Sequence, residues 1–186
     1  MPSFGAILDA CVLIPLPLCD TLLRAAEKGM YRVQWSEDIL SEVQRNLIHQ
    51  LNVPPEKALR RVQLMREAFE EAQVDGYERI IPSLTNHAKD RHVLAAAIVS
   101  GSQVVVTSNL QHFPEASLES HGVEAQSPDE FLTNLFDLYP SDMVQILRDQ
   151  VSALHNPKTT IEQVILSISR DAPAFAELVQ ARISGE

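Results

Sequence analysis

Two polar residues that can bind a cation or hold a water molecule stand where buried strands are expected to end. Asp9 follows the apolar run 4–8, and Asn109 follows the valine-rich run 103–107 by way of Ser108. Short apolar runs of this kind are typical of buried strands. Ligands of open α/β sheets bind beyond the carboxyl ends of the strands, so we expect Asp9 and Asn109 to lie at one crevice.

Two further acids are expected to reach the same crevice from helices. Asp90 lies near the start of the apolar segment 93–99, and Glu42 lies one turn into the helix after the second strand. For Asp90 taken singly, the alternative interpretation is a simple helix N-cap. For Glu42 it is a solvated helix residue. Clustered carboxylates repel each other, and Mg²⁺ or Mn²⁺ relieves this repulsion because both ions prefer oxygen ligands. Such a site can deprotonate water for attack on a phosphodiester. The candidate metal ligands are therefore Asp9, Glu42 and Asp90, and the candidate catalytic residues are these three with Asn109.

The elements that must position these residues alternate between extended and helical patterns. Strands are expected at 4–8, 31–35, 76–81, 103–107 and 123–125, and helices at 21–28, 36–51, 54–73, 86–100 and 127–138. This alternation predicts an α/β fold with a mostly parallel sheet. After Pro140, three helical patterns follow without a strand, the second beginning at a capping box over 159–162. We therefore expect a domain at 1–139 and a C-terminal helical extension at 140–186.

The composition excludes several classes of protein. The chain has 186 residues, of which 45% are apolar and 22% charged, as in ordinary globular domains. Neither an apolar stretch of membrane-spanning length nor a secretory signal pattern is present, so no membrane association and a cytoplasmic location are expected. Cys11 and Cys19 are too few for a disulfide framework and are expected to be reduced thiols.

The distribution of charge limits how the chain can meet an anionic polymer. The net charge is −10, which disfavours nucleic-acid binding driven by charge alone. Residues 1–93 carry 11 basic and 13 acidic side chains, whereas residues 94–186 carry 4 and 12. An RNA backbone should therefore approach the first half, where the candidate contacts are Arg60, Arg61 and Arg91; a solvated helix face is the alternative for such basic residues.

Several segments together resemble one known family. They are Ile7-Leu8-Asp9-Ala10, Trp35-Ser36-Glu37 leading to Glu42, Asp90-Arg91-His92-Val93-Leu94-Ala95-Ala96-Ala97, Val106-Thr107-Ser108-Asn109 with Phe113-Pro114, and Ser127-Pro128-Asp129-Glu130-Phe131. Over roughly residues 3–137 the chain resembles PIN-domain ribonucleases of the VapC toxin type. The resemblance implies a three-layer α/β/α PIN-like fold and a Mg²⁺- or Mn²⁺-dependent endoribonuclease. It also implies a toxin held inactive by a small cognate antitoxin protein, with a homodimer as a further assembly to consider.

The resemblance also shows where this chain departs from the family pattern. Asp9, Glu42 and Asp90 match three family acids, and Asn109 occupies the fourth position, which is Asp or Asn. Where this subgroup often has Asp before Phe-Pro, the chain has His112. His112 can be interpreted as a contact to the scissile phosphate or as a local hydrogen-bonding residue of its loop. With three acids rather than four, the presence of a second metal ion stays open. The alternative function is that of a PIN fold that only binds antitoxin or RNA.

A second class of enzyme also places Asp at a strand end. Aspartyl-phosphate phosphatases need a second Asp two residues later, where this chain has Cys11. Receiver domains need adjacent acids near the N-terminus and a lysine after a late strand, and neither is present. Both are therefore disfavoured.

The extension at 140–186 carries a net charge of −2, which disfavours a nucleic-acid clamp. Each of its helices has one apolar stripe that must be buried against another surface. The surfaces expected are the PIN body, a second copy or the antitoxin. We expect the extension to regulate cleavage rather than perform it.

Overall fold

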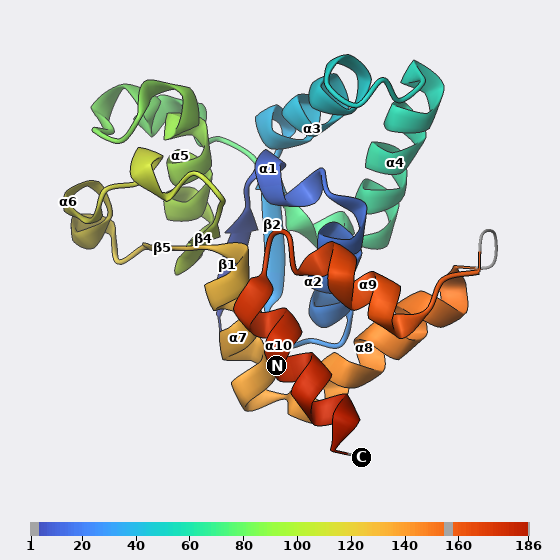
Figure 1. Ribbon diagram of the computed structural model, residues 1–186. Coiled ribbons are helices and arrows are strands. Elements are labelled where there is room, and N and C mark those ends of the chain that lie inside the picture. Colours follow the sequence, from blue (N-terminus) through green and yellow to red (C-terminus); the bar gives the residue numbers. More distant parts are fainter. Residues whose placement is uncertain (1–3, 155–157, 186) are drawn as a thin grey trace.

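A computed structural model describes residues 4–154 and 158–185, and its centre is a parallel sheet of five strands (Figure 1). The order in the sheet is β3-β2-β1-β4-β5. The strands are β1 (Gly5–Leu8), β2 (Arg32–Ser36), β3 (Gln73–Val74), β4 (Val104–Val106) and β5 (Glu124–Gln126). The central strands β1 and β4 are buried along their whole length, which explains why both are continuous apolar runs. The expected α/β fold with a parallel sheet is confirmed.

Helices cover both faces of the sheet and complete the three expected layers. The helices that follow the strands are α1 (Ala10–Leu13), α2 (Leu16–Glu27), α3 (Glu37–His49), α4 (Pro55–Ala68), α5 (Arg91–Ser100), α6 (Glu115–Leu118) and α7 (Pro128–Leu138). Crossovers between parallel strands are almost always right-handed, which for this strand order puts α1–α4 on one face and α5 on the other. Helix α5 packs against β1, β2, β3 and β4, which is why its centre is apolar on all sides.

The strand order places a topological switch between β1 and β4. The chain leaves β1 toward β2 on one side, whereas it leaves β4 toward β5 on the other. The two strands are paired in register, with Leu8 opposite Val106. Connections that diverge in this way leave an open crevice above the carboxyl ends of the two strands, where ligands of such sheets bind.

Four expected elements differ from the structure. The helix expected at 54–73 ends at Ala68, and the 3-10 turn η1 (Glu70–Ala72) leads from it into β3. The helix expected at 21–28 begins at Leu16, because Pro17 suits a first helical turn and Asp20 pairs with Arg24 instead of capping. Segment 76–81 is not a strand, since Gly76 takes a left-handed φ of +77° that turns the chain away and β3 pairs with β2 earlier. The helix expected at 86–100 starts at Arg91, and a 3-10 turn, η3 (Ala88–Asp90), precedes it.

The C-terminal segment forms α8 (Pro140–Ala153), α9 (Ile161–Ile168) and α10 (Pro173–Ser184), and its described residues lack a strand apart from an isolated bridge. These helices pack against α2 and α7. Of the docking surfaces expected for the extension, the structure therefore shows the chain's own body. The capping box joins Thr160 to Gln163, one residue later than expected. None of the described helices is long and apolar enough to span a membrane.

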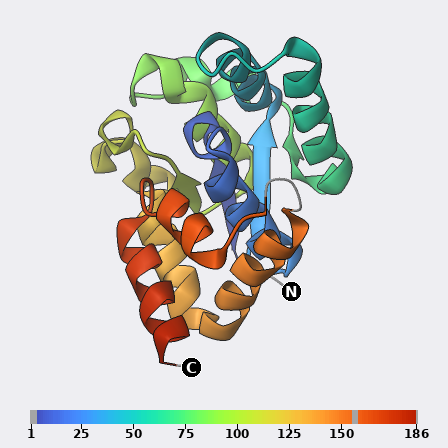
Figure 2. The same cartoon turned by 45° about the vertical axis from the view of Figure 1, so that its right-hand side comes forward.

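Two side chains, Gln150 and Asp129, make the hydrogen bonds that fix this docking. Gln150 of α8 donates to the Pro17 carbonyl and to the Thr21 hydroxyl, at 3.1 and 2.9 Å. Asp129 of α7 accepts from the backbone N–H groups of Ala174 and Phe175, at 3.1 and 2.9 Å, and so caps the start of α10 from another helix. Figures 1 and 2 show α7, α8 and α10 gathered at the end of the molecule opposite α3 and α5.

We predict that Asp129→Ala destabilises the protein by roughly 0.5–2 kcal/mol, the usual cost of removing an N-cap side chain. The free energy of unfolding can be measured by urea denaturation. The matched control is Glu130→Ala, because Glu130 is the exposed neighbour in the same helical turn. Equal destabilisation by the two substitutions would contradict the capping role.

Candidate active site

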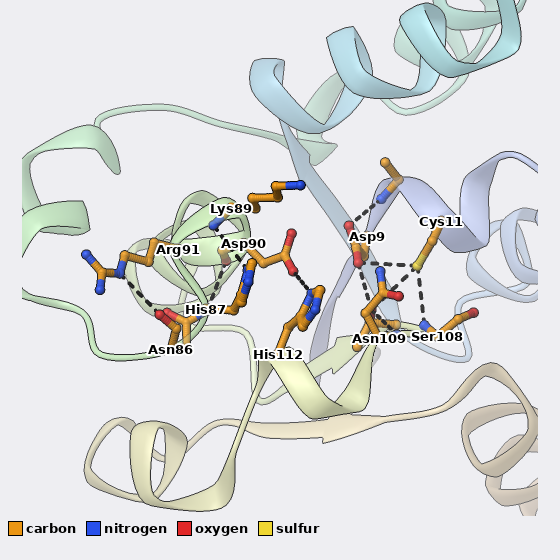
Figure 3. Close-up of polar contacts among 12 residues, drawn as sticks. Asp9, Cys11, Asn86, His87, Lys89, Asp90, Arg91, Ser108, Asn109 and His112 are labelled. Atoms are coloured by element: carbon orange, nitrogen blue, oxygen red, sulfur yellow. Dashed lines mark hydrogen bonds and ion pairs between the residues drawn. The ribbon is translucent and has the colours of Figure 1, made fainter. Parts of the chain in front are cut away.

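Asp9 lies at the carboxyl end of β1 and is only 3% exposed. Its Oδ1 accepts from the backbone N–H of Ala10 at 2.7 Å and so caps α1. Its Oδ2 accepts from the Thr107 hydroxyl at 2.7 Å and from the Cys11 thiol at 3.3 Å. Figure 3 shows this carboxylate between the two segments that follow β1 and β4. Both oxygens are thus held in place by donors from those segments.

The charges around Asp9 are those of a site that favours a cation. Burial raises the pKa of Asp9 above its usual value; the hydrogen bonds from Thr107 and Cys11 lower it, and the negative charge of Asp90 raises it. Burial, and then the charge of Asp9, raise the pKa of the Cys11 thiol to about 12. The thiol therefore stays protonated at neutral pH and serves as a hydrogen-bond donor.

Asp90 approaches Asp9 from the start of α5 and is 8% exposed. Its Oδ2 lies 2.5 Å from Nδ1 of His112, which ends the short turn η4 (Leu110–His112). The His112 ring in turn stacks on that of His87, with ring centroids 4.0 Å apart and planes at 14°. Asp90 does not cap α5 with its side chain, so the simple N-cap alternative is not what the structure shows.

Glu42 reaches the same helix from α3. Its Oε2 lies 3.9 Å from Nε2 of His92, in the first turn of α5, and its side chain is 32% exposed. His92 is mostly buried, and its Nδ1 has no hydrogen-bond partner among the described residues. Glu42 is therefore not fully solvated, and its carboxylate lies near the first turn of α5.

Asn109 follows β4 at the other side of the crevice. Its backbone N–H donates to the Thr107 hydroxyl at 3.0 Å, so Thr107 links Asn109 to Asp9. Figure 3 shows the Asn109 side chain beside Asp9 and Cys11.

The four predicted residues form an open arrangement. Asp9 and Asp90 are close enough for their charges to interact, and Asn109 adjoins Asp9. Within the described parts of the chain, however, Asp9, Glu42 and Asp90 do not form a trio whose donor atoms all lie within 4.8 Å. A cation shared by the three would require their side chains to move closer together.

The predicted RNA contacts have different surroundings. The side chain of Arg60 is 59% exposed and lies 3.5 Å from a Glu67 oxygen. The guanidinium of Arg61 donates to the carbonyl oxygens of Leu13 and Ile14 at the end of α1, which gives it a structural role. Arg91 donates to the Asn86 carbonyl at 3.2 Å.

Comparison with known proteins assigns the fold to a family. A family model described as a PIN domain matches residues 5–111, which run from β1 to η4 and include all four predicted site residues. The chain belongs to the PIN domain family. A second model, described as the VapC50 C-terminal domain, matches residues 128–181, which run from α7 into α10. Both matches support the VapC-type assignment of this PIN domain protein.

A curated relative supports the same assignment. The protein named "Putative ribonuclease VapC50" of Mycobacterium tuberculosis is 38% identical over 101 residues, which cover 54% of this chain and 60% of the relative. This chain therefore spans less than two thirds of the relative's length.

The sequence interpretation missed His87. The structure brings His87 to His112 and Asp90 through the turns η3 and η4. The available signal was the three-residue spacing of His87 and Asp90, with a further histidine in the segment after the next strand. Thr107 was expected at the end of the valine-rich strand, but its hydrogen bond to Asp9 could not be anticipated.

We predict that Asp9→Asn makes the metal-free PIN domain protein more stable than the wild type at neutral pH. A raised pKa in the folded chain means that ionisation of Asp9 opposes folding. The wild type should therefore lose stability as the pH rises from about 4, near the unfolded value, through the folded pKa. Asparagine has no charge to bury, and the Thr107 hydroxyl can turn to accept from its amide.

Urea unfolding in EDTA at a series of pH values measures this difference. The gap between Asp9→Asn and the wild type should widen as the pH rises and then stay constant. Parallel stability curves over the whole range would contradict a buried, charged Asp9.

Proposed function

We propose that this PIN domain protein is a divalent-metal-dependent endoribonuclease. The observation that carries the proposal is the Asp9 carboxylate, which is buried at the switch point of the sheet beside the like charge of Asp90. A buried carboxylate pair is costly unless a cation compensates it. The family and the printed name of the relative support ribonuclease chemistry.

The donor set fits Mg²⁺ or Mn²⁺. Asp9, Glu42 and Asp90 would hold the ion, since all three offer carboxylate oxygens and hard cations prefer oxygen. When bound, such an ion lowers the pKa of water and polarises a phosphate oxygen. Three acids suit one metal ion better than they suit two metal ions.

The residues of the chain would position the reactants. The Thr107 hydroxyl and the Cys11 thiol hold Asp9 in one orientation through their hydrogen bonds. Asn109 adjoins this carboxylate and would orient the attacking water through its side-chain amide. Arg60, Arg91 and His112 would contact the RNA backbone, whereas Arg61 is already bonded to two carbonyl groups.

We propose further that the protein is the toxin of a toxin–antitoxin pair, with a small antitoxin protein as its partner. The VapC-type matches support this. The helices α8–α10 lie away from α3 and α5 (Figure 2), which fits a regulatory or structural role rather than a catalytic one. Expression without the partner should arrest growth, and expression of Asp9→Asn should not.

The purified chain should cleave single-stranded RNA in Mg²⁺ or Mn²⁺ and not in EDTA. Asp9→Asn should reduce the cleavage rate by more than about 100-fold, because even loss of an outer-shell partner commonly costs 10–100-fold. The control is Asp137→Asn, an exposed acid of α7. Full activity of Asp9→Asn or in EDTA would contradict the metal assignment. Folded protein without any metal-stimulated cleavage would favour a PIN fold that only binds its partner or RNA.

Asn109→Asp should tighten Mg²⁺ binding, because it adds a carboxylate charge beside a set with three acids. The dissociation constant can be measured by calorimetric titration. Weaker or unchanged Mg²⁺ binding would place Asn109 outside the ion's ligands.

A further inference from the structure

Three side chains that can bind a metal lie together, and the proposed Mg²⁺ site uses only one of them. His87, Asp90 and His112 each offer a ligand atom, and these atoms all lie within 4.8 Å of one another. Figure 3 shows the two imidazoles and the Asp90 carboxylate together, to one side of Asp9. His87 and His112 come from two turns that are 25 positions apart in the chain.

The backbone holds this group in place. The His87 N–H donates to the His112 carbonyl at 3.1 Å, and the Asp90 N–H donates to the His87 carbonyl at 2.9 Å. These bonds tie η3 to η4 and fix the three Cα positions before any ion binds. Preorganisation of this kind is what a metal site requires of its scaffold.

The donor atoms decide which class of ion would bind. Two imidazole nitrogens and one carboxylate oxygen suit zinc and neighbouring first-row transition ions, whereas Mg²⁺ takes mainly oxygen. We propose that His87, Asp90 and His112 form a binding site for a first-row transition ion such as Zn²⁺, which shares Asp90 with the proposed Mg²⁺ site at Asp9.

The geometry permits such an ion after small side-chain movements. His112 Nδ1 and Asp90 Oδ2 are 2.5 Å apart, and the ion replaces the proton between them. Zinc bonds of about 2.0–2.2 Å at tetrahedral angles separate ligand atoms by roughly 3.4 Å, so this pair opens by about 1 Å.

The third ligand is free to adjust. His87 Nδ1 accepts from the Lys89 N–H at 3.4 Å, which leaves Nε2 for the ion. In-plane lone pairs of two nearly parallel rings do not converge on one ion, so the exposed His87 ring turns about its Cβ–Cγ bond and gives up the long hydrogen bond from the Lys89 N–H. Three protein ligands with one exposed member leave the fourth zinc position to water.

Zinc titration of the metal-free full chain tests the proposal. The wild type should bind one Zn²⁺ that His87→Ala and His112→Ala each weaken by more than about tenfold. The control His121→Ala, an exposed histidine elsewhere, should bind as the wild type does. Co²⁺ in place of Zn²⁺ should give visible absorption that both variants lose. Unchanged Zn²⁺ affinity in His87→Ala and His112→Ala would overturn the site.

Further variants keep the test decisive. His112→Asn retains an amide that can donate to Asp90 but removes the imidazole ligand, so it replaces His112→Ala if that variant unfolds. Asp9→Asn should lose Mg²⁺ binding and keep the Zn²⁺ site. Zn²⁺ binding that depends on Asp9 but not on the histidines would overturn this proposal and leave the proposed ribonuclease site standing. Mg²⁺ binding that is unaffected by Asp9→Asn would overturn the proposed ribonuclease site and leave the Zn²⁺ proposal standing.

Discussion

The hydrogen bond from the Thr107 hydroxyl to the Asp9 carboxylate is the contact on which the candidate site depends. It exists because β1 and β4 are neighbours in register, so that the residues following Leu8 and Val106 emerge side by side. The Asp9 N–H donates to the Val106 carbonyl at 3.1 Å, which extends the ladder by one step. A carboxylate held in this way is buried, oriented and in need of a compensating cation.

The central part of this arrangement could be predicted from the sequence. Two continuous apolar runs, each followed by polar residues, predict parallel buried strands and a crevice at their carboxyl ends. The structure confirms these strands and places Asp9 and Asn109 beside Thr107. The start of α3 was predictable too, because Ser36 accepts from the Ile39 N–H as an N-cap does.

Contacts that depend on loops could not be predicted. The group of His87, Asp90 and His112 requires two 3-10 turns to meet, and neither turn has an apolar period in the sequence. The role of Arg61 depends on the end of a four-residue helix that no pattern indicated. The short strand β3 has two residues, too few for alternation to appear.

The fold places the candidate site and the C-terminal helices in different parts of the molecule. The switch point of the sheet lies on the side of α3 and α5, whereas α8 and α10 lie toward the other end and α9 packs on α2 (Figure 1). Gln150 and Asp129 tie these helices to the body. This layout allows the C-terminal helices to stabilise the body without adding ligands to the candidate site.

The most direct test of the account is a crystal structure of the protein soaked in Mn²⁺, with anomalous diffraction used to locate the ion. The account predicts an anomalous peak against the Asp9 carboxylate, with Asp90 as a second ligand. A structure at saturating Mn²⁺ with no peak at Asp9 would contradict the central claim that this buried carboxylate is a metal ligand.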